Sequence, residues 1–105
     1  MRFALLVVAL AACSNERCRK AYAEFDRTWR AGVIAETASM QLPQATVETM
    51  IHAYTDTLPT REELAAIRRT HDVGIRPDES DLEWRAAWPA AEQAIDACGE
   101  GASRP

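Results

Sequence analysis

Residues 18–33, CRKAYAEFDRTWRAGV, carry an apolar side chain at every third or fourth position. The members of this stripe are Cys18, Tyr22, Phe25, Trp29 and Val33, and the same steps continue to Thr37 and Met40. This spacing is typical of one face of an α-helix and differs from the alternation of a strand. Most of the charged residues fall between the stripe positions, so the stretch predicts an amphipathic helix that buries one face against a partner.

A matching stripe lies near the other end of the sequence, in WRAAWPAAEQAIDAC at 84–98. When the two stretches are laid antiparallel, their apolar residues meet in one nearly constant register that ends in a pair of cysteines. The pairs are Cys18–Cys98, Tyr22–Ile95, Phe25–Ala91, Trp29–Trp88 and Val33–Trp84. We therefore expect the first and last helices to pack side by side and to be joined by a Cys18–Cys98 disulfide.

Proline and glycine residues divide the chain into four helical blocks. We expect helices over 16–41 and 44–57, a short helix between Thr60 and Gly74, and a fourth from Ser80 to Cys98. No segment has the period-two pattern of a strand. The predicted fold is all-α: a small four-helix bundle whose antiparallel first and last helices are stapled by a disulfide.

Two capping boxes mark the starts of the third and fourth helices, Thr60 with Glu63 and Ser80 with Glu83. Gly74 is expected to end the third helix as its C-cap. Pro89 falls inside the fourth block, where a proline either kinks a helix or begins a new segment. Because the apolar stripe continues in phase through Pro89, we favour a kinked but continuous helix.

The chain opens with MRFALLVVALAAC, a basic start, an apolar run over 3–10 and two small residues before Cys13. These are the parts of a secretory signal peptide, and the run is too short for a membrane-spanning helix. We expect a signal peptide over 1–12 that is removed, a short tether over 13–15, one helical domain over 16–98 and a disordered tail over 99–105.

The motif Leu10-Ala11-Ala12-Cys13 resembles the lipobox of bacterial lipoproteins. This resemblance implies that Cys13 carries fatty acyl chains and anchors the protein to membrane lipid. Ser14 stands where the family uses Asp as its inner-membrane retention signal, which implies the inner leaflet of the outer membrane, facing the periplasm. The alternative is cleavage after an A-x-A site, with Cys13 left as a free thiol.

Three cysteines in an exported chain leave one unpaired unless one is modified. Lipidation of Cys13 leaves Cys18 and Cys98 as a pair in an oxidising compartment. Their bond closes a loop of about eighty residues, worth roughly 4 to 4.7 kcal/mol by the chain-entropy model. Neither a C-x-x-C motif nor zinc-ligand spacing is present, so the sequence gives no reason to expect a cofactor or a metal.

Glu48, His52 and Asp56 follow one another at four-residue steps and so lie on one face of the second helix. Such a trio suits either acid–base or metal chemistry, or else a solvated polar face, which we favour. His71 ends the third helix, where the helix dipole favours a histidine. No catalytic motif is present, and a non-enzymatic protein is expected.

Trp29, Trp84 and Trp88 are interpreted first as core residues of a small bundle, and second as a possible groove for a partner. The net charge of −4 argues against binding of nucleic acid. Arg17, Arg19 and Lys20 form a basic cluster that suits either anionic headgroups or a solvated helix face.

We expect a lipid-anchored protein that binds another envelope protein as an assembly or accessory factor. In general architecture, though not in any motif, it resembles the helical pilotins of secretion systems, which carry a secretin helix in a groove. A second hypothesis is an immunity or exclusion lipoprotein encoded by a phage or mobile element. A third and weaker one is an enzyme that uses Glu48, His52 and Asp56.

Overall fold

The computed structural model describes residues 2–72 and 79–105, with side chains over 16–71 and 82–105. Its elements are α1 (Arg2–Thr37), the 3₁₀ turn η1 (Ala38–Met40), α2 (Gln44–Thr55), α3 (Arg61–Asp72) and α4 (Glu79–Cys98). Over the described residues these elements and one isolated bridge, Thr57 with Ser103, make up the regular structure. The all-α prediction is confirmed.

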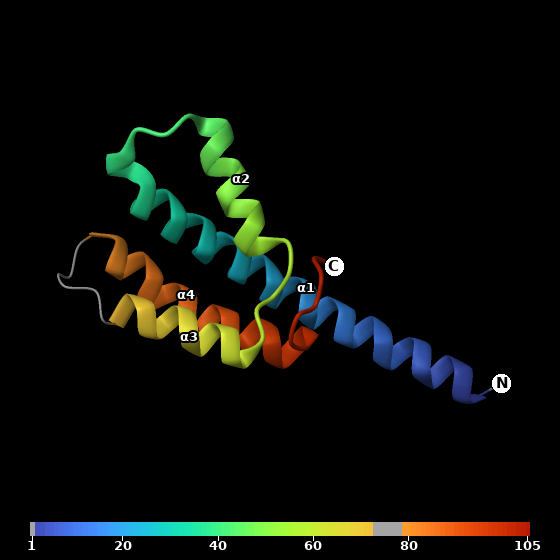
Figure 1. Ribbon diagram of the computed structural model, residues 1–105. Helices are drawn as coiled ribbons and strands as arrows, with labels where there is room; N and C mark the ends of the chain where they lie inside the picture. Colours follow the sequence, from blue (N-terminus) through green and yellow to red (C-terminus); the bar gives the residue numbers. More distant parts are fainter. Residues whose placement is uncertain (1, 73–78) are drawn as a thin grey trace.

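The long helix α1 packs antiparallel along α4, and this pair is the main contact of the fold (Figure 1). Cys18 and Cys98 form a disulfide with an S–S length of 2.01 Å and a Cα–Cα distance of 4.9 Å. The paired residues of the two predicted stripes are otherwise all buried: Tyr22, Phe25, Trp29, Val33, Trp84, Trp88, Ala91 and Ile95. Beyond the pairs, Thr37 is also buried, but Met40 is 59% exposed, so the expected stripe of the first helix ends before Met40. The predicted seam between the first and last helices is thus confirmed.

Gly32 allows the close approach of α1 and α4, which the apolar pattern did not reveal. A Cβ atom built on Gly32 would lie 2.9 Å from Cε2 of Trp84 and 3.0 Å from its Cδ2. A methyl group cannot occupy that space without displacing the indole. The indole of Trp84 therefore lies directly on the backbone of α1.

The bounds of α1 differ from the expected 16–41. The helix begins at Arg2 and continues without a break through 13–15, the residues that we expected to form a short tether. The leader holds no Pro or Gly and is rich in Leu and Ala, so nothing stops the helix there. At its other end α1 tightens into η1, and Gln41 adopts the left-handed conformation with φ 54°.

The short helices α2 and α3 are close to prediction. α2 ends at Thr55 instead of 57, because the chain turns there to bury Leu58, which is 2% exposed. The capping box at the start of α3 is confirmed: the Glu63 N–H donates to Oγ1 of Thr60 at 3.0 Å, and the Thr60 N–H donates back to Glu63 at 3.4 Å.

Pro89 lies inside α4, which continues through it as expected. The proline itself is exposed, on the side of α4 away from the core. α4 begins at Glu79, ahead of the predicted cap at Ser80. The side chain of Ser80, and the expected end of α3 at Gly74, lie outside the described part of the chain.

The C-terminal residues 99–105 are not the disordered tail that we expected. They turn back after α4, with positive φ at Gly99 (98°) and Gly101 (68°), and run beside the end of α2. The Leu58 N–H donates to the Ala102 carbonyl at 2.8 Å, and the Arg104 N–H donates to the Asp56 carbonyl at 3.1 Å. These backbone hydrogen bonds hold the segment in place, and the composition of the segment did not predict them.

The side chain of Arg104 joins this segment to two helices. Its Nη2 donates to Oδ1 of Asp26 in α1 at 3.0 Å and to the Thr55 carbonyl in α2 at 3.2 Å. The guanidinium carbon also lies 5.5 Å from the ring centroid of Tyr22. The hydrogen bond to Asp26 raises the pKa of Arg104 above its ordinary value. Arg104 therefore acts as a clasp between α1, α2 and the C-terminal segment.

Candidate functional site

The bundle is open along one edge, between α2 and α3. α1 packs against both α4 and α2, and α3 packs against α4, but no Cα atom of α2 lies within 8 Å of one in α3. In Figure 1, α2 diverges from the layer formed by α3 and α4. A closed four-helix bundle packs every helix against two neighbours, so this fold lacks one of the four contacts.

A groove follows this open edge. One hollow of about 210 Å³ is lined by residues that include Trp29, Tyr54, Pro59, Glu63 and Ile67. A second hollow of about 260 Å³ is lined by Glu36, Tyr54, Ile67, Thr70, His71 and Trp84. Tyr54 of α2 and Ile67 of α3 line both hollows, so the two lie next to one another between α2 and α3, and together they are called the groove here.

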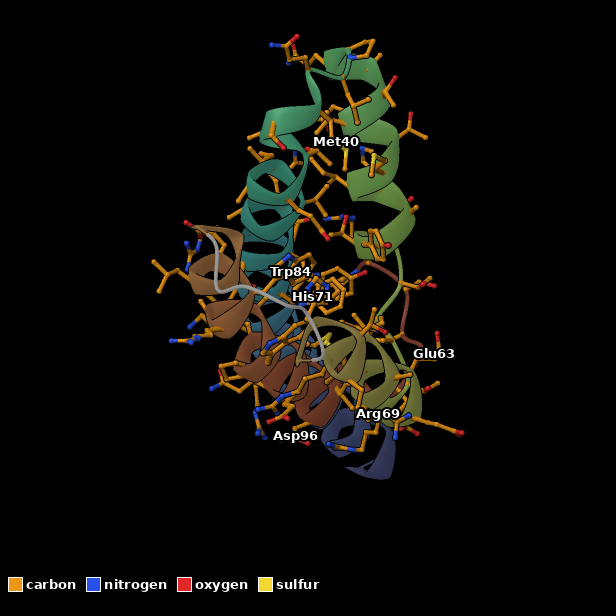
Figure 2. All side chains as sticks on the ribbon, turned by 60° about the vertical axis from the view of Figure 1, so that its left-hand side comes forward. Met40, Glu63, Arg69, His71, Trp84 and Asp96 are labelled. Atoms are coloured by element: carbon orange, nitrogen blue, oxygen red, sulfur yellow. A yellow bond between two sulfur atoms is a disulfide. The ribbon has the colours of Figure 1, made fainter. Side chains whose placement is uncertain are left out.

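Aromatic rings form the floor of the groove and the core beneath it. The ring centroids of Trp29 and Trp84 lie 5.2 Å apart at 85°, and Trp84 stacks on Trp88 at 5.2 Å and 18°. His71 lies against this pair, 4.8 Å from Trp84 and 5.4 Å from Trp88. Figure 2 shows His71 of α3 and Trp84 of α4 next to one another at the centre of the molecule.

The tryptophans predicted as a possible partner groove are first of all core residues. Trp29, Trp84 and Trp88 are 1%, 3% and 6% exposed. Trp29 and Trp84 line one hollow each, whereas Trp88 lines neither. Trp29 and Trp84 are therefore core residues that also line a hollow, and Trp88 is a core residue alone. Binding of a partner at these tryptophans stays a prediction.

The three indole N–H groups are not equally satisfied. Nε1 of Trp29 donates to the Ala87 carbonyl of α4 at 3.1 Å. Nε1 of Trp84 is buried and has no hydrogen-bond acceptor within the described part of the chain. A buried donor without an acceptor costs about 1–3 kcal/mol, so the Trp84 N–H, judged by the described residues, lowers the stability of the fold.

Tyr54 and Ile67 line the groove, but the sequence analysis did not single them out as candidate site residues. Tyr54 is 44% exposed although its ring centroid lies 6.1 Å from that of Trp29. Neither residue has an unusual sequence context. The signal that distinguishes them is the spacing of α2 from α3, which no pattern within a single helix reports.

The structure brings Glu48, His52 and Asp56 together on the exposed face of α2. Nδ1 of His52 lies 3.0 Å from Asp56 and Nε2 lies 3.9 Å from Glu48. Arg30 of α1 donates to Glu48 at 2.8 Å, and Arg104 lies 3.7 Å from Asp56. The trio therefore belongs to a row of charges along the α1–α2 boundary.

In the described part of the chain, neither hollow of the groove is lined by Glu48, His52 or Asp56. Over the same part, no group of three or more His, Cys, Asp or Glu residues is arranged to hold a metal ion. His52 contacts Glu48 and Asp56 along α2, and these two carboxylates form ion pairs with Arg30 of α1 and Arg104 of the C-terminal segment.

Tyr22 is the buried titratable group nearest to this row. Its hydroxyl donates to the Thr55 carbonyl at 2.6 Å, which ties α1 to the end of α2. Burial raises the pKa of Tyr22, and the nearby carboxylates of Asp56 and Asp26 add to that rise while Arg104 opposes it. The phenol therefore stays protonated and serves as a structural donor.

The side chain of Cys13 lies outside the described part of the chain, so its predicted lipidation stays a prediction. Among the described helices none has a stretch both long and apolar enough to cross a membrane. Comparison with known proteins gives no match to a protein-family model, to a curated protein or to a solved structure.

Proposed function

We propose that this protein is a non-enzymatic lipoprotein of the bacterial envelope whose groove between α2 and α3 binds an amphipathic helix of another envelope protein. The open edge of the bundle carries the proposal. A helix laid between α2 and α3 contacts both walls at once and supplies the contact that the bundle lacks.

The lining of the groove fits such a helix. Its floor and walls offer aromatic and aliphatic surface from Trp29, Tyr54, Ile67 and Trp84. Apolar side chains spaced at i, i+3 or i+4, and i+7 on one helix face follow both hollows in turn.

Charge at the groove selects among amphipathic helices. Each hollow has one carboxylate at its edge, Glu36 in one and Glu63 in the other, and both residues are exposed. Lys or Arg residues that flank the apolar stripe of the partner complement these carboxylates. The proposed occupant is therefore a helix with an apolar face and basic flanks.

The place of action follows from the lipobox-like motif at Leu10–Cys13. Two acyl chains hold a protein stably at a bilayer, whereas one chain binds only marginally. We propose the inner leaflet of the outer membrane, so that the partner meets the groove in the periplasm. Globomycin, which blocks lipoprotein signal peptidase, is expected to make the uncleaved precursor accumulate. Normal processing in its presence would contradict lipidation of Cys13.

Site-specific photocrosslinking in intact cells tests the groove. A photoreactive amino acid at Ile67 or at Ala53 is expected to give one and the same adduct, because both positions line one hollow. The matched control position is Ala86, which is exposed on the outer side of α4. An adduct of equal yield from Ala86 would show that the groove is not the binding surface.

The identity of the adduct decides between occupants. The crosslinked segment is synthesised as a peptide and is expected to bind the wild-type protein. Its affinity for the variant Ile67→Glu should be at least tenfold lower, because the bound helix would desolvate the charge on the groove wall. An adduct of two copies of this chain contradicts a heterologous partner. A secreted toxin as the partner would favour an immunity lipoprotein over an assembly factor.

A further inference from the structure

A third hollow, separate from the groove, lies where α1 and α4 meet near the disulfide. It has a volume of about 370 Å³ and is lined by Arg17, Lys20, Ala21, Gln93, Asp96 and Ala97. Arg17 and Lys20 are three residues apart and therefore project from the same face of α1. The hollow thus presents two cations and a side-chain amide within one site.

The positive charge of this hollow is only weakly neutralised within the protein. Arg17 has no ion pair among the residues described, and Lys20 has one exposed contact, at 3.7 Å from Glu16. The one carboxylate in the lining, that of Asp96, is hydrogen-bonded and ion-paired to Arg61 of α3. That hydrogen bond raises the pKa of Arg61, which stays charged and offsets the repulsion that Asp96 exerts on an anion.

The position of these cations along α1 matches the phosphate layer of a membrane to which Cys13 is attached. α1 is continuous through this region, so a rise of 1.5 Å per residue places Arg17 and Lys20 about 6 Å and about 10 Å from Cys13 along the axis. The chain has a net charge of −4, yet its 16–20 segment holds three cations and one carboxylate.

The hollow also lies away from the groove. Lys20 and Tyr22 are two residues apart, which places them on nearly opposite sides of α1. Because Tyr22 contacts Thr55 at the end of α2, the Lys20 side of α1 faces away from α2. A membrane that contacts Arg17 and Lys20 therefore leaves the open edge between α2 and α3 accessible.

We propose that this hollow binds the phosphate of an anionic phospholipid headgroup. Arg17 and Lys20 pair with the phosphate oxygens, and the amide of Gln93 donates a further hydrogen bond. This inference rests on the membrane location given in the proposed function. It does not depend on the groove or on its partner. The headgroup contact fixes the orientation of the domain on the bilayer.

Titration with short-chain lipid tests this site in a chain that begins at Ser14 and so lacks the proposed lipid anchor at Cys13. All described core residues lie between Tyr22 and Ala102, so the chain that begins at Ser14 keeps them. Short-chain phosphatidylglycerol, below its micelle concentration, is expected to shift the NMR signals of the Gln93 side-chain amide and the Arg17 Nε–H. Short-chain phosphatidylcholine and inorganic phosphate serve as the other two arms.

Variants assign the binding to the hollow. The double variant R17Q/K20Q is expected to weaken phosphatidylglycerol binding about tenfold or more, since each surface cation contributes on the order of one tenfold step at most. R69Q/R85Q removes the same charge from two exposed arginines elsewhere and should change the affinity less than twofold. Asp96→Asn removes the only carboxylate of the lining and should tighten binding.

Three outcomes would overturn the proposal. Equal losses in R17Q/K20Q and R69Q/R85Q show general electrostatic attraction and no site. Inorganic phosphate that binds as tightly as phosphatidylglycerol shows a site for the free anion. No change of the Gln93 and Arg17 signals with phosphatidylglycerol shows no headgroup site. Each result leaves the groove and the processing of Cys13 untouched, because those are tested by photocrosslinking and by globomycin.

Discussion

Gly32 and Trp84 are in direct contact across the α1–α4 seam, and a Cβ atom on Gly32 would lie 2.9 Å from Cε2 of the indole. Substitution of Gly32 by Ala should therefore destabilise the protein by about 1–3 kcal/mol in spite of the better helix propensity of Ala. Chemical denaturation measures the change. In a Trp84→Leu background the same Gly32→Ala substitution should be neutral or stabilising by up to about 1 kcal/mol, and an equal loss in both backgrounds would refute the contact.

The two groove-floor tryptophans offer a matched comparison of a satisfied and an unsatisfied indole. Trp29→Phe removes the hydrogen bond to the Ala87 carbonyl, whereas Trp84→Phe removes a buried donor that has no acceptor among the described residues. Both substitutions lose similar volume, so Trp29→Phe should cost about 1 kcal/mol more. Urea unfolding of both variants measures this difference in stability. A larger loss of stability for Trp84→Phe would show that the indole N–H of Trp84 has a hydrogen-bond partner in solution.

The disulfide joins residues 80 positions apart and restricts the unfolded chain. Cys18→Ser should lower the free energy of unfolding by about 4.5 kcal/mol at most under oxidising conditions, according to the chain-entropy model. Thermal melting followed by circular dichroism, with and without a reductant, measures this effect. The wild type in reductant should approach the variant. Equal melting temperatures of oxidised wild type and Cys18→Ser would contradict a stabilising role of the bond.

The C-terminal segment should contribute to stability, which a disordered tail would not do. Removal of residues 102–105 deletes the acceptor of the Leu58 N–H and the whole Arg104 clasp. We expect a loss of about 1–3 kcal/mol, because at least one backbone bond and one charge-assisted bond disappear. The conservative control Arg104→Lys keeps the charge but loses the several N–H donors of the guanidinium. Its stability should lie between those of the wild type and the truncated chain. A truncated chain as stable as the wild type would exclude the clasp.

The raised pKa of Tyr22 predicts a loss of stability at alkaline pH. Burial favours the neutral phenol in the folded state, so the native protein holds this proton more tightly than the unfolded chain does. The contribution is present below the ordinary tyrosine value of 10.0 and is lost as the pH rises through the higher value of the folded protein. Tyr22→Phe should be less stable at pH 8 and show a smaller decline above pH 10, as urea unfolding at several pH values would show.

The α1–α4 seam was predictable because it depends on repeating patterns within each helix and on two cysteines that mark its register. The same patterns placed the paired seam residues, 22 to 33 on α1 and 84 to 95 on α4, in the core. The capping box at Thr60 was likewise predictable, because it depends on residues three positions apart.

The groove and the C-terminal clasp were not predictable in the same way. A stripe shows which face of α2 or α3 is apolar, but the distance between the two helices depends on how both dock onto α1 and α4. The clasp depends on Arg104, whose partners Asp26 and Thr55 lie far away in the sequence. The segment 99–105 was expected to be disordered, but the positive φ angles of Gly99 and Gly101 turn the chain back toward α2.

The position of the disulfide has a mechanical consequence. It welds α1 to α4 at the end from which the N-terminal part of α1 extends (Figure 1). A force that acts between the groove and the N-terminus is therefore carried by two covalently joined helices, α1 and α4, and not by side-chain contacts alone. Under the proposed function, a partner that pulls on the groove against an anchor at Cys13 would not separate α1 from α4 at the anchored end, because the bond between them is covalent.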